Sequence, residues 1–266
     1  MTNQSRPGTP SQESEILMSV SLVIEDDVAQ LQLGRPDAGN AFDLPAALSL
    51  RDAVQTLASA PDVRVVLLTA SGPLFCAGGD VRAMAAAPDR EKFIFELASV
   101  LHEALVALRA LPVPIVAAVH GTAAGAGIGL VLAADLVLAS EKAKFVSAYG
   151  RIGLSPDCGV SALLAAAVGP RRAALFALTD ITLNAATAVE WGLISESCAP
   201  EALDDRVNEV VAQLAGNATN CAGEAARLLR LATERAYAAQ LDDEAATISR
   251  LAQTDEAGAL IAAFGS

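Results

Sequence analysis

The sequence predicts an α/β protein built on a mainly parallel sheet with helical crossovers, followed by a C-terminal region that is entirely helical. Short apolar runs rich in β-branched residues alternate with helical patterns up to about residue 200. Such alternation favours a parallel sheet, because parallel neighbours must be joined by a crossover. Beyond Pro200 the strand pattern does not recur. A chain of 266 residues, 53% of them hydrophobic, can bury a substantial core.

The chain divides into three parts. Residues 1–17 are mostly polar, contain two prolines and show no apolar period, which predicts a disordered leader. Residues 18–200 carry the alternating strands and helices and form the predicted core. Residues 201–266 carry helices whose apolar stripes exceed what a small helical tail can bury by itself. We therefore expect this region to pack on another subunit.

The first half of the core starts with a predicted hairpin. Two strand patterns, Ser19–Glu25 and Val28–Leu33, flank the turn residues Asp26 and Asp27. A helix then begins at Asp43-Leu44-Pro45 and runs to about Ala58. The other elements expected before residue 120 are a strand at Arg64–Ala70, a short helix at Val81–Ala87, a long amphipathic helix at Arg90–Ala110 and a buried strand at Ile115–Val119.

The second half continues the alternation and ends in helices. Gly153–Gly159 is predicted to be a loop, and Asn184 is placed to cap a helix. Strands are expected at Asp135–Ser140, Lys144–Val146 and Leu193–Ser197, and helices at Val160–Val168, Arg171–Leu178, Ala185–Trp191, Ala202–Leu214, Glu224–Ala239 and Asp242–Ala252.

Charge and composition exclude several classes of function. The 31 acidic residues outnumber the 18 basic ones, giving a formal net charge of −13, and no cluster of Lys or Arg offers a surface for nucleic acid. The apolar run Ala123–Ala134 is shorter than the roughly 20 residues that a membrane-spanning helix needs. We expect no membrane association.

The cysteine and histidine residues predict neither a disulfide framework nor a metal site. The four cysteines are widely spaced without a C-x-x-C pair, and the two histidines, His102 and His120, stand far apart. No basic segment followed by an apolar stretch opens the sequence, so a secretion signal is not expected. Together these features predict reduced thiols and a cytoplasmic location.

Two glycine-rich loops carry the candidate site. One follows the strand at Ile115–Val119 and leads into a helix, and the other follows the strand at Arg64–Ala70. Helix starts leave backbone N–H groups unpaired, and these groups suit a developing negative charge. Two strand ends with such loops can bring two N–H donors onto one oxygen. Glycines also serve as packing turns without a ligand, which is the simpler interpretation.

Five motifs occur in an order that resembles the enoyl-CoA hydratase/isomerase, or crotonase, superfamily. The resemblance implies a spiral of ββα units, a C-terminal helical trimerisation region, and a homotrimer or dimer of trimers. It also implies an acyl-CoA substrate and no separate cofactor, since coenzyme A is part of that substrate. The motifs are LGRPDAGNAF (Leu33–Phe42), FCAGGDV (Phe75–Val81), AAVHGTAAGAGIGLVLAADLVLA (Ala117–Ala139), FVSAYGRIGLSPDCG (Phe145–Gly159) and AVEWGLI (Ala188–Ile194).

The resemblance implies roles for named residues. By motif position, the two backbone donors that bind the thioester oxygen fall on Gly79 and Ala126. The glutamates of the family's hydratases align with Gly129 and Tyr149, so ordinary hydration by two glutamates is not expected. Asp157 remains at a position where isomerase-like members carry an aspartate. The residues expected to bind substrate are Ala77, Gly78, Asp80, Gly125 and Tyr149.

One carboxylate suffices for moving a double bond. A base that removes the proton beside a thioester carbonyl can return the same proton two carbons away, which converts a 3-enoyl into a 2-enoyl thioester. We therefore expect an enoyl-CoA isomerase with Asp157 as its acid and base. The alternative is a purely structural role, in which Asp157 caps the helix at Val160. Asp80 is expected to cap the helix at Val81.

Other functions stay open at this level. The protein can be a hydratase or hydrolytic enzyme with substituted acids, an enzyme in which Asp157 attacks carbon as a nucleophile, or a member that binds acyl-CoA without turnover. A dinucleotide-binding oxidoreductase is disfavoured, because Leu130 stands where the G-x-G-x-x-G pattern needs its third glycine. Cys76 and Cys158, which lie beside site residues, are read as small apolar fillers.

Overall fold

The computed structural model describes residues 19–216, 221–231 and 237–264. Two sheets form the centre of the fold, with strand orders β1-β2-β3-β4-β6-β9 and β5-β7-β8. In the larger sheet only the β1/β2 hairpin is antiparallel, which confirms the predicted mainly parallel arrangement. The strands are β1 (Val20–Glu25), β2 (Val28–Leu33), β3 (Val65–Ala70), β4 (Ile115–Val119), β5 (Ala123–Ala124), β6 (Leu136–Ser140), β7 (Lys144–Val146), β8 (Thr182–Asn184) and β9 (Glu196–Cys198).

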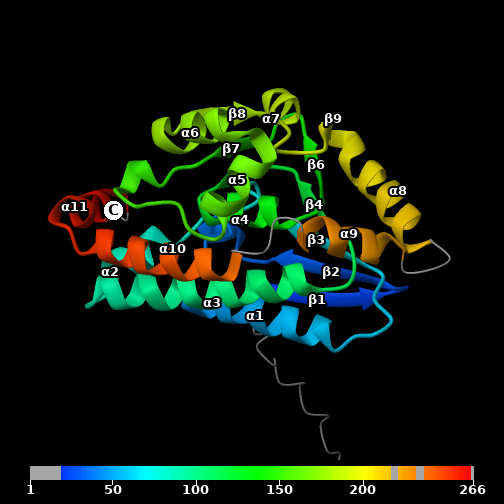
Figure 1. Cartoon of the computed structure of the whole chain (residues 1–266), viewed down its shortest axis with the longest axis horizontal. Helices are drawn as coiled ribbons and strands as arrows, with labels where there is room; N and C mark the ends of the chain where they lie inside the picture. Colours follow the sequence, from blue (N-terminus) through cyan, green and yellow to red (C-terminus); the bar gives the residue numbers. More distant parts are fainter. Residues whose placement is uncertain (1–18, 217–220, 232–236, 265–266) are drawn as a thin grey trace, which may run out of the picture.

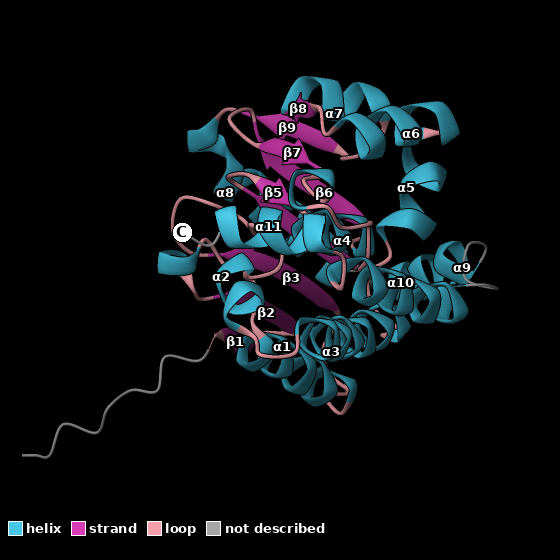
Figure 2. Cartoon of the chain, turned by 90° about the vertical axis from the view of Figure 1, so that its left-hand side faces the viewer, coloured by secondary structure: helices cyan, strands magenta, loops and turns pink. Residues whose placement is uncertain are grey.

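Helices cover both faces of the larger sheet (Figures 1 and 2). The predicted helices of the core are present within a few residues of their expected ends. The α-helices are α1 (Leu44–Ala58), α2 (Val81–Ala86), α3 (Arg90–Ala110), α4 (Ala126–Ala133), α5 (Val160–Val168), α6 (Pro170–Thr179), α7 (Ala185–Trp191), α8 (Leu203–Ala215), α9 (Cys221–Leu231), α10 (Tyr237–Ala252) and α11 (Asp255–Phe264). Short 3-10 turns lie at η1 (Pro36–Ala38), η2 (Gly150–Ile152) and η3 (Pro200–Ala202).

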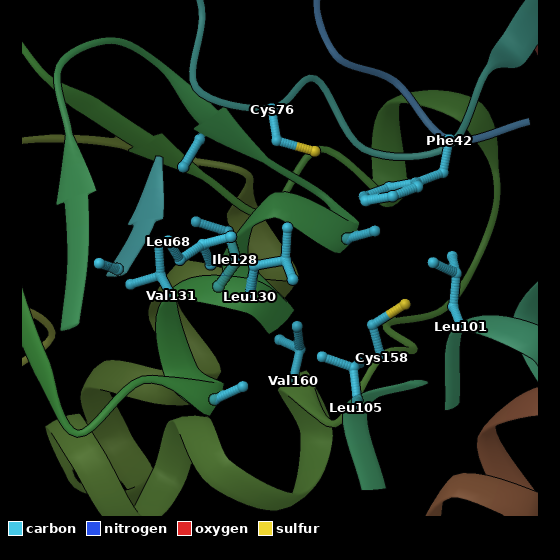
Figure 3. Close-up of a cluster of buried hydrophobic side chains, with 14 of the residues drawn as sticks. Phe42, Leu68, Cys76, Leu101, Leu105, Ile128, Leu130, Val131, Cys158 and Val160 are labelled. Atoms are coloured by element: carbon cyan, nitrogen blue, oxygen red, sulfur yellow. The ribbon is translucent and has the colours of Figure 1, made fainter. Parts of the chain in front are cut away.

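The alternation of side chains along the central strands divides the core in two. Val66 and Leu68 of β3 face the main cluster with α1, α3 and α4, whereas Val65 and Leu67 face a smaller cluster formed with α8. Successive strand residues point to opposite faces, so both faces of β3 must be apolar when both are covered. The main cluster runs from Leu68 to the start of α5 (Figure 3).

The C-terminal helices fold back over their own chain. α10 packs along α3, and α11 contacts α2 and η2. The apolar stripes of α10 and α11 are therefore buried within the chain, and the expectation that they need another subunit to cover them was wrong for these two helices. The buried residues of these helices include Leu241, Ala245, Ile248, Ala252, Ala257 and Ile261. Assembly into trimers stays a prediction.

Some predicted elements differ from those in the structure, and others lie outside the described residues. The predicted leader, residues 1–17, lies outside the described residues, and so do residues 232–236 inside the single helix expected at Glu224–Ala239. The structure has α9 before this gap and α10 after it, and it adds α11. Strands β5 and β8 were not predicted, because two or three residues are too few to show a period. Across the described parts of the chain, no helix is long and apolar enough to cross a membrane.

A buried arginine fastens α9 to the core. The guanidinium of Arg230 donates to both carboxylate oxygens of Asp135, which lies directly before β6. It also donates to the carbonyl oxygens of Arg109 at 2.7 Å, Leu111 at 2.9 Å and Val113 at 2.7 Å, along the connection from α3 to β4. One side chain thus satisfies three buried carbonyls that no helix or strand pairs.

We expect Arg230→Gln to lower the free energy of unfolding by about 3 kcal/mol, because the change leaves a mostly buried carboxylate without its charge partner. Urea denaturation of the purified variant measures this loss. Arg227→Gln is the matched control on the same helix, since Arg227 forms an ion pair at the surface with Glu224 and should cost less than about 0.5 kcal/mol. Equal losses of unfolding free energy in the two variants would contradict the stabilising role of Arg230.

Candidate active site

Most of the predicted site residues line one cavity. The cavity has a volume of about 210 Å³ and lies between the two glycine loops, α3, the η2 turn and α10. Its walls are largely apolar and include Met84, Leu97, Leu101 and Ile248. Seven of the eight predicted residues line it: Ala77, Gly78, Gly79, Gly125, Ala126, Tyr149 and Asp157. The eighth, Asp80, does not line the cavity.

The two glycine loops touch each other backbone to backbone. The N–H of Ala124 donates to the carbonyl of Cys76 at 2.8 Å. Gly78 has φ of +100°, and a Cβ there would lie 3.0 Å from the Ala124 oxygen and 3.3 Å from the Ala126 nitrogen. A Cβ at Gly127 would lie 2.6 Å from the Cys76 oxygen. Glycine is therefore required at both positions for the loops to meet.

The two amide groups expected to bind an oxygen are available for a ligand. Ala126 is the first residue of α4, where a helix leaves its N–H groups unpaired. Among the backbone hydrogen bonds of the described residues, none uses the N–H of Gly79 or that of Ala126 as donor. Both residues line the cavity, on loops that are in contact through Gly78.

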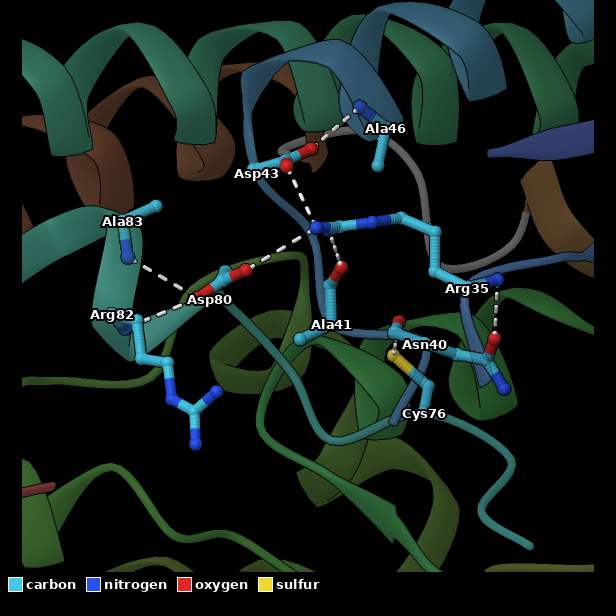
Figure 4. A network of polar contacts seen from close by, with 9 residues as sticks. All are labelled: Arg35, Asn40, Ala41, Asp43, Ala46, Cys76, Asp80, Arg82 and Ala83. Carbon is cyan, nitrogen blue, oxygen red and sulfur yellow. Dashed lines mark hydrogen bonds and ion pairs between the residues drawn. The ribbon is translucent and has the colours of Figure 1, made fainter. Parts of the chain in front are cut away.

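A second network, which the sequence did not predict, fixes the loop that carries Gly79 (Figure 4). Arg35 pairs with Asp43 at 2.8 Å and with Asp80 at 3.4 Å, and it donates to the carbonyl of Ala41 at 2.5 Å. Asp80 accepts hydrogen bonds from the first N–H groups of α2, which confirms its predicted capping role. Arg35 lies within the first recognised motif, yet nothing in the spacing indicated its partners.

Asn40 supports the same loop from the other side. It has φ of +56°, a left-handed conformation that asparagine tolerates better than most residues. Its side-chain N–H₂ group donates to the carbonyls of Ser71 and Leu74, each at 2.8 Å, and its side-chain oxygen accepts from the N–H of Arg35 at 2.9 Å. The start of the loop is thereby tied to the segment before α1.

Asp157 is held at the cavity by a tyrosine and is buried, with 8% of its surface exposed. The hydroxyl of Tyr149 donates to its Oδ1 at 2.6 Å. The side chain does not cap α5, because the cap position is Gly159 and no side chain bonds there. The bland alternative, a capping aspartate, was wrong. Burial, and next the charge of Asp157, raise the pKa of Tyr149 well above its usual value, so its hydroxyl stays protonated.

His102, whose role the sequence did not indicate, supports Asp157 from α3. Its Nε2 accepts the N–H of Cys158 at 3.2 Å. Burial lowers the pKa of His102 against the opposing effect of the nearby Asp157 charge, so the ring is neutral and can accept. A ring nitrogen of His102, a carboxylate oxygen of Asp157 and the sulfur of Cys158 all lie within 4.8 Å of one another. In the sequence, the one feature that could have indicated this role of His102 is its place among the apolar residues on the buried side of α3.

The position of Gly129 is closed by Cys158. A Cβ on Gly129 would lie 2.5 Å from the carbonyl oxygen and 2.7 Å from the Cβ of Cys158. Cys158 itself has φ of +50°, so its peptide turns toward α4. No side chain can be added at Gly129 unless the segment that carries Asp157 moves. The two positions that align with the family's glutamates thus hold a packing contact and the donor to Asp157.

The remaining polar residues singled out in the sequence have structural roles. Burial raises the pKa of the Cys76 thiol to about 12, so it stays neutral, and its Sγ lies 3.3 Å from the carbonyl of Asn40. A ring nitrogen of His120 forms a hydrogen bond with the carbonyl of Gly72 at 2.8 Å. The neutral thiol agrees with the interpretation of Cys76 as a small apolar filler.

Comparison with known proteins agrees with this geometry. Residues 23–264 match the family described as "Enoyl-CoA hydratase/isomerase". The chain is 33% identical over 199 residues to a trans-2-decenoyl-[acyl-carrier-protein] isomerase of Streptococcus mutans. The aligned region covers 74% of this chain and 76% of the relative. The chain is 34% identical over 226 residues to the 1,2-epoxyphenylacetyl-CoA isomerase of Escherichia coli. This alignment covers 83% of this chain and 85% of the relative.

Solved structures show the same fold. The crystal structure of an enoyl-CoA hydratase from Mycobacterium avium subsp. paratuberculosis superimposes with a TM-score of 0.84 at 32% identity and covers 92% of this chain and 95% of that one. The family match over residues 23–264 includes the two glycine loops and the C-terminal helices. The chain belongs to the enoyl-CoA hydratase/isomerase family.

Proposed function

We propose that the protein is an enoyl-CoA isomerase that converts 3-enoyl into 2-enoyl thioesters, with Asp157 as the acid and base. The observation that carries this proposal is the single carboxylate of the site. Among the described residues that line the cavity, Asp157 is the only aspartate or glutamate. The two relatives compared above, both named isomerases, support a reaction of this class.

The mechanism uses the two amides and one carboxylate. The thioester oxygen lies between the N–H groups of Gly79 and Ala126, where it takes up negative charge as the enolate forms. Asp157 removes a proton from the carbon beside the carbonyl, so that a C–H bond breaks and an O–H bond forms. The same proton then passes to the carbon two positions away, and the double bond becomes conjugated with the carbonyl.

Each part of the cavity has a task in this scheme. The apolar walls exclude water, which strengthens the hydrogen bonds to the enolate and protects it from unwanted protonation. They also favour an apolar acyl group over a charged one. No separate cofactor is needed, because one side chain carries the proton in both steps and coenzyme A belongs to the substrate.

Hydration is less compatible with this site. Adding water requires one group that activates water and another that protonates carbon. The Gly129 position cannot hold an acid, because Cys158 fills the space. The hydroxyl of Tyr149 is bound to Asp157 and its pKa is raised, which makes it a poor base. Of the two groups that hydration requires, the site supplies only the carboxylate of Asp157 among the described residues that line the cavity.

Asp157→Asn is expected to lower kcat for 3-hexenoyl-CoA by about 100-fold or more, because the amide keeps the shape but cannot accept the proton. The assay follows the absorbance of the conjugated product. Asp62→Asn, an exposed turn residue, removes an equal charge and should leave the rate unchanged. A wild-type protein that binds the thioester without converting it would instead support a binding function, and covalent labelling of Asp157 during turnover would support nucleophilic attack.

Ala126→Pro tests the proposed oxyanion site. Ala126 is the first residue of α4, where proline fits a helix; the substitution removes the N–H and places the ring Cδ in its position. We expect kcat to fall about 100-fold while the melting temperature stays close to that of the wild type. Retained activity in the folded variant would show that this amide does not bind the reacting oxygen.

Gly129→Glu restores an acid at the position where related hydratases carry one. We expect no hydratase activity and a loss of about 2 kcal/mol in unfolding free energy, because the new side chain overlaps the Cys158 backbone. Ala166→Glu adds the same charge at an exposed site of α5 and serves as the control in urea denaturation. A stable Gly129→Glu variant that hydrates crotonyl-CoA would contradict the closed position.

A further inference from the structure

Resting on the proposed function, we propose that Tyr149 is a positioning residue that fixes which oxygen of Asp157 exchanges the proton. Its hydroxyl donates to Oδ1 at 2.6 Å. Within the described part of the chain, no hydrogen bond engages Oδ2 of Asp157. The bond therefore holds the carboxylate by one oxygen and leaves the other for the substrate.

The backbone of Tyr149 is held independently of the side-chain hydroxyl. Its carbonyl oxygen accepts the N–H groups of Ile152 and Leu154, each at 3.1 Å, so the backbone of the residue starts the η2 turn. The residue is buried, with 6% of its surface exposed, and it lines the cavity beside Asp157. A phenylalanine at this position can keep the turn and the wall while it lacks the donor.

The hydrogen bond favours the ionised carboxylate. An O–H donor at this distance from a charged oxygen forms a strong, charge-assisted bond. The other titratable groups near Asp157 are His102, which is neutral, and the buried thiol of Cys158. Arg151 lines the cavity, but its guanidinium donates to the carbonyl of Asp180. Tyr149 is thus the side chain that donates a hydrogen bond to this carboxylate.

Orientation matters because the base serves two carbons. The carboxylate must lie within hydrogen-bonding reach of the first carbon to take the proton and then of the second to return it. A carboxylate free to rotate would spend less time aimed at either carbon, and small errors of position reduce rates strongly. The tyrosine proton itself is not transferred, since its bond to Oδ1 persists through both steps.

The test compares Tyr149→Phe with the wild type on 3-hexenoyl-CoA. We expect kcat to fall about tenfold or more with KM nearly unchanged, because the variant still binds the thioester. A merely structural role would disturb the cavity wall and raise KM as well, so the split between kcat and KM is the readout that separates the two roles.

The chain offers a matched control. Its only other tyrosine is Tyr237, which is buried but does not line the cavity. Tyr237→Phe deletes the same hydroxyl and should leave both kcat and KM as in the wild type. Thermal unfolding of the two variants shows whether each one is folded at assay temperature.

A second measurement does not depend on activity. In the Tyr237→Phe background Tyr149 is the sole tyrosine, so the ultraviolet absorbance of tyrosinate reports its ionisation. Adding Asp157→Asn should lower the pH at which this absorbance appears, because the carboxylate charge opposes the ionisation of Tyr149. An unchanged titration would show that the two side chains are not coupled, and the inference would fall.

The outcomes separate the two proposals. If the wild type does not convert the thioester, the proposed function fails, and the tyrosinate titration still reports whether the pair exists. If Asp157→Asn abolishes conversion but Tyr149→Phe keeps the kcat of the wild type, the isomerase stands and the positioning role is refuted. If Tyr149→Phe is unfolded, the titration of the folded Tyr237→Phe variants decides.

Discussion

The site depends on a backbone contact that side chains would prevent. The two loops meet because Gly78 and Gly127 have no Cβ, so the Cys76 segment can approach the start of α4 within hydrogen-bonding distance. Gly79 and Ala126, which follow separate strands, line the same cavity beside this contact. The carboxyl ends of neighbouring parallel strands lie at one edge of a sheet, which gives the loops their common location. The polar network of Arg35 and Asn40 then fixes one of the two loops.

A second close backbone approach at a glycine lies next to Asp157. Gly129 lacks a side chain, and the peptide of Cys158 occupies the space, which sets the position of the preceding residue. His102 accepts the N–H of this peptide from one side, while Tyr149 donates to the carboxylate from the other. The resemblance aligns Gly129 and Tyr149 with the family's glutamates. In the structure Gly129 packs against Cys158, and Tyr149 donates a hydrogen bond to Asp157.

The C-terminal helices contribute to the cavity and to the packing around it. Ile248 of α10 forms part of the wall, and α11 lies against the η2 turn that begins after Tyr149. Arg230 anchors the preceding helix through Asp135 and three carbonyl groups. The tail is thus part of the site in this chain, and any role in assembly between subunits comes in addition to that one.

The sequence by itself determined the order of the core elements and the two glycine loops, and it predicted Asp157 as the acid and base. Apolar periods, caps and short motifs are local, and they depend on neighbouring residues along the chain. Only the tertiary structure decided what the local pattern does not contain: the hydrogen bond between His102 and Cys158, 56 residues apart, the closure of Gly129 by Cys158, and the burial of α10 against α3. These contacts depend on distances between segments that are remote in sequence. A lone histidine or glycine gives no sign of its distant partner, because either residue is compatible with many local environments.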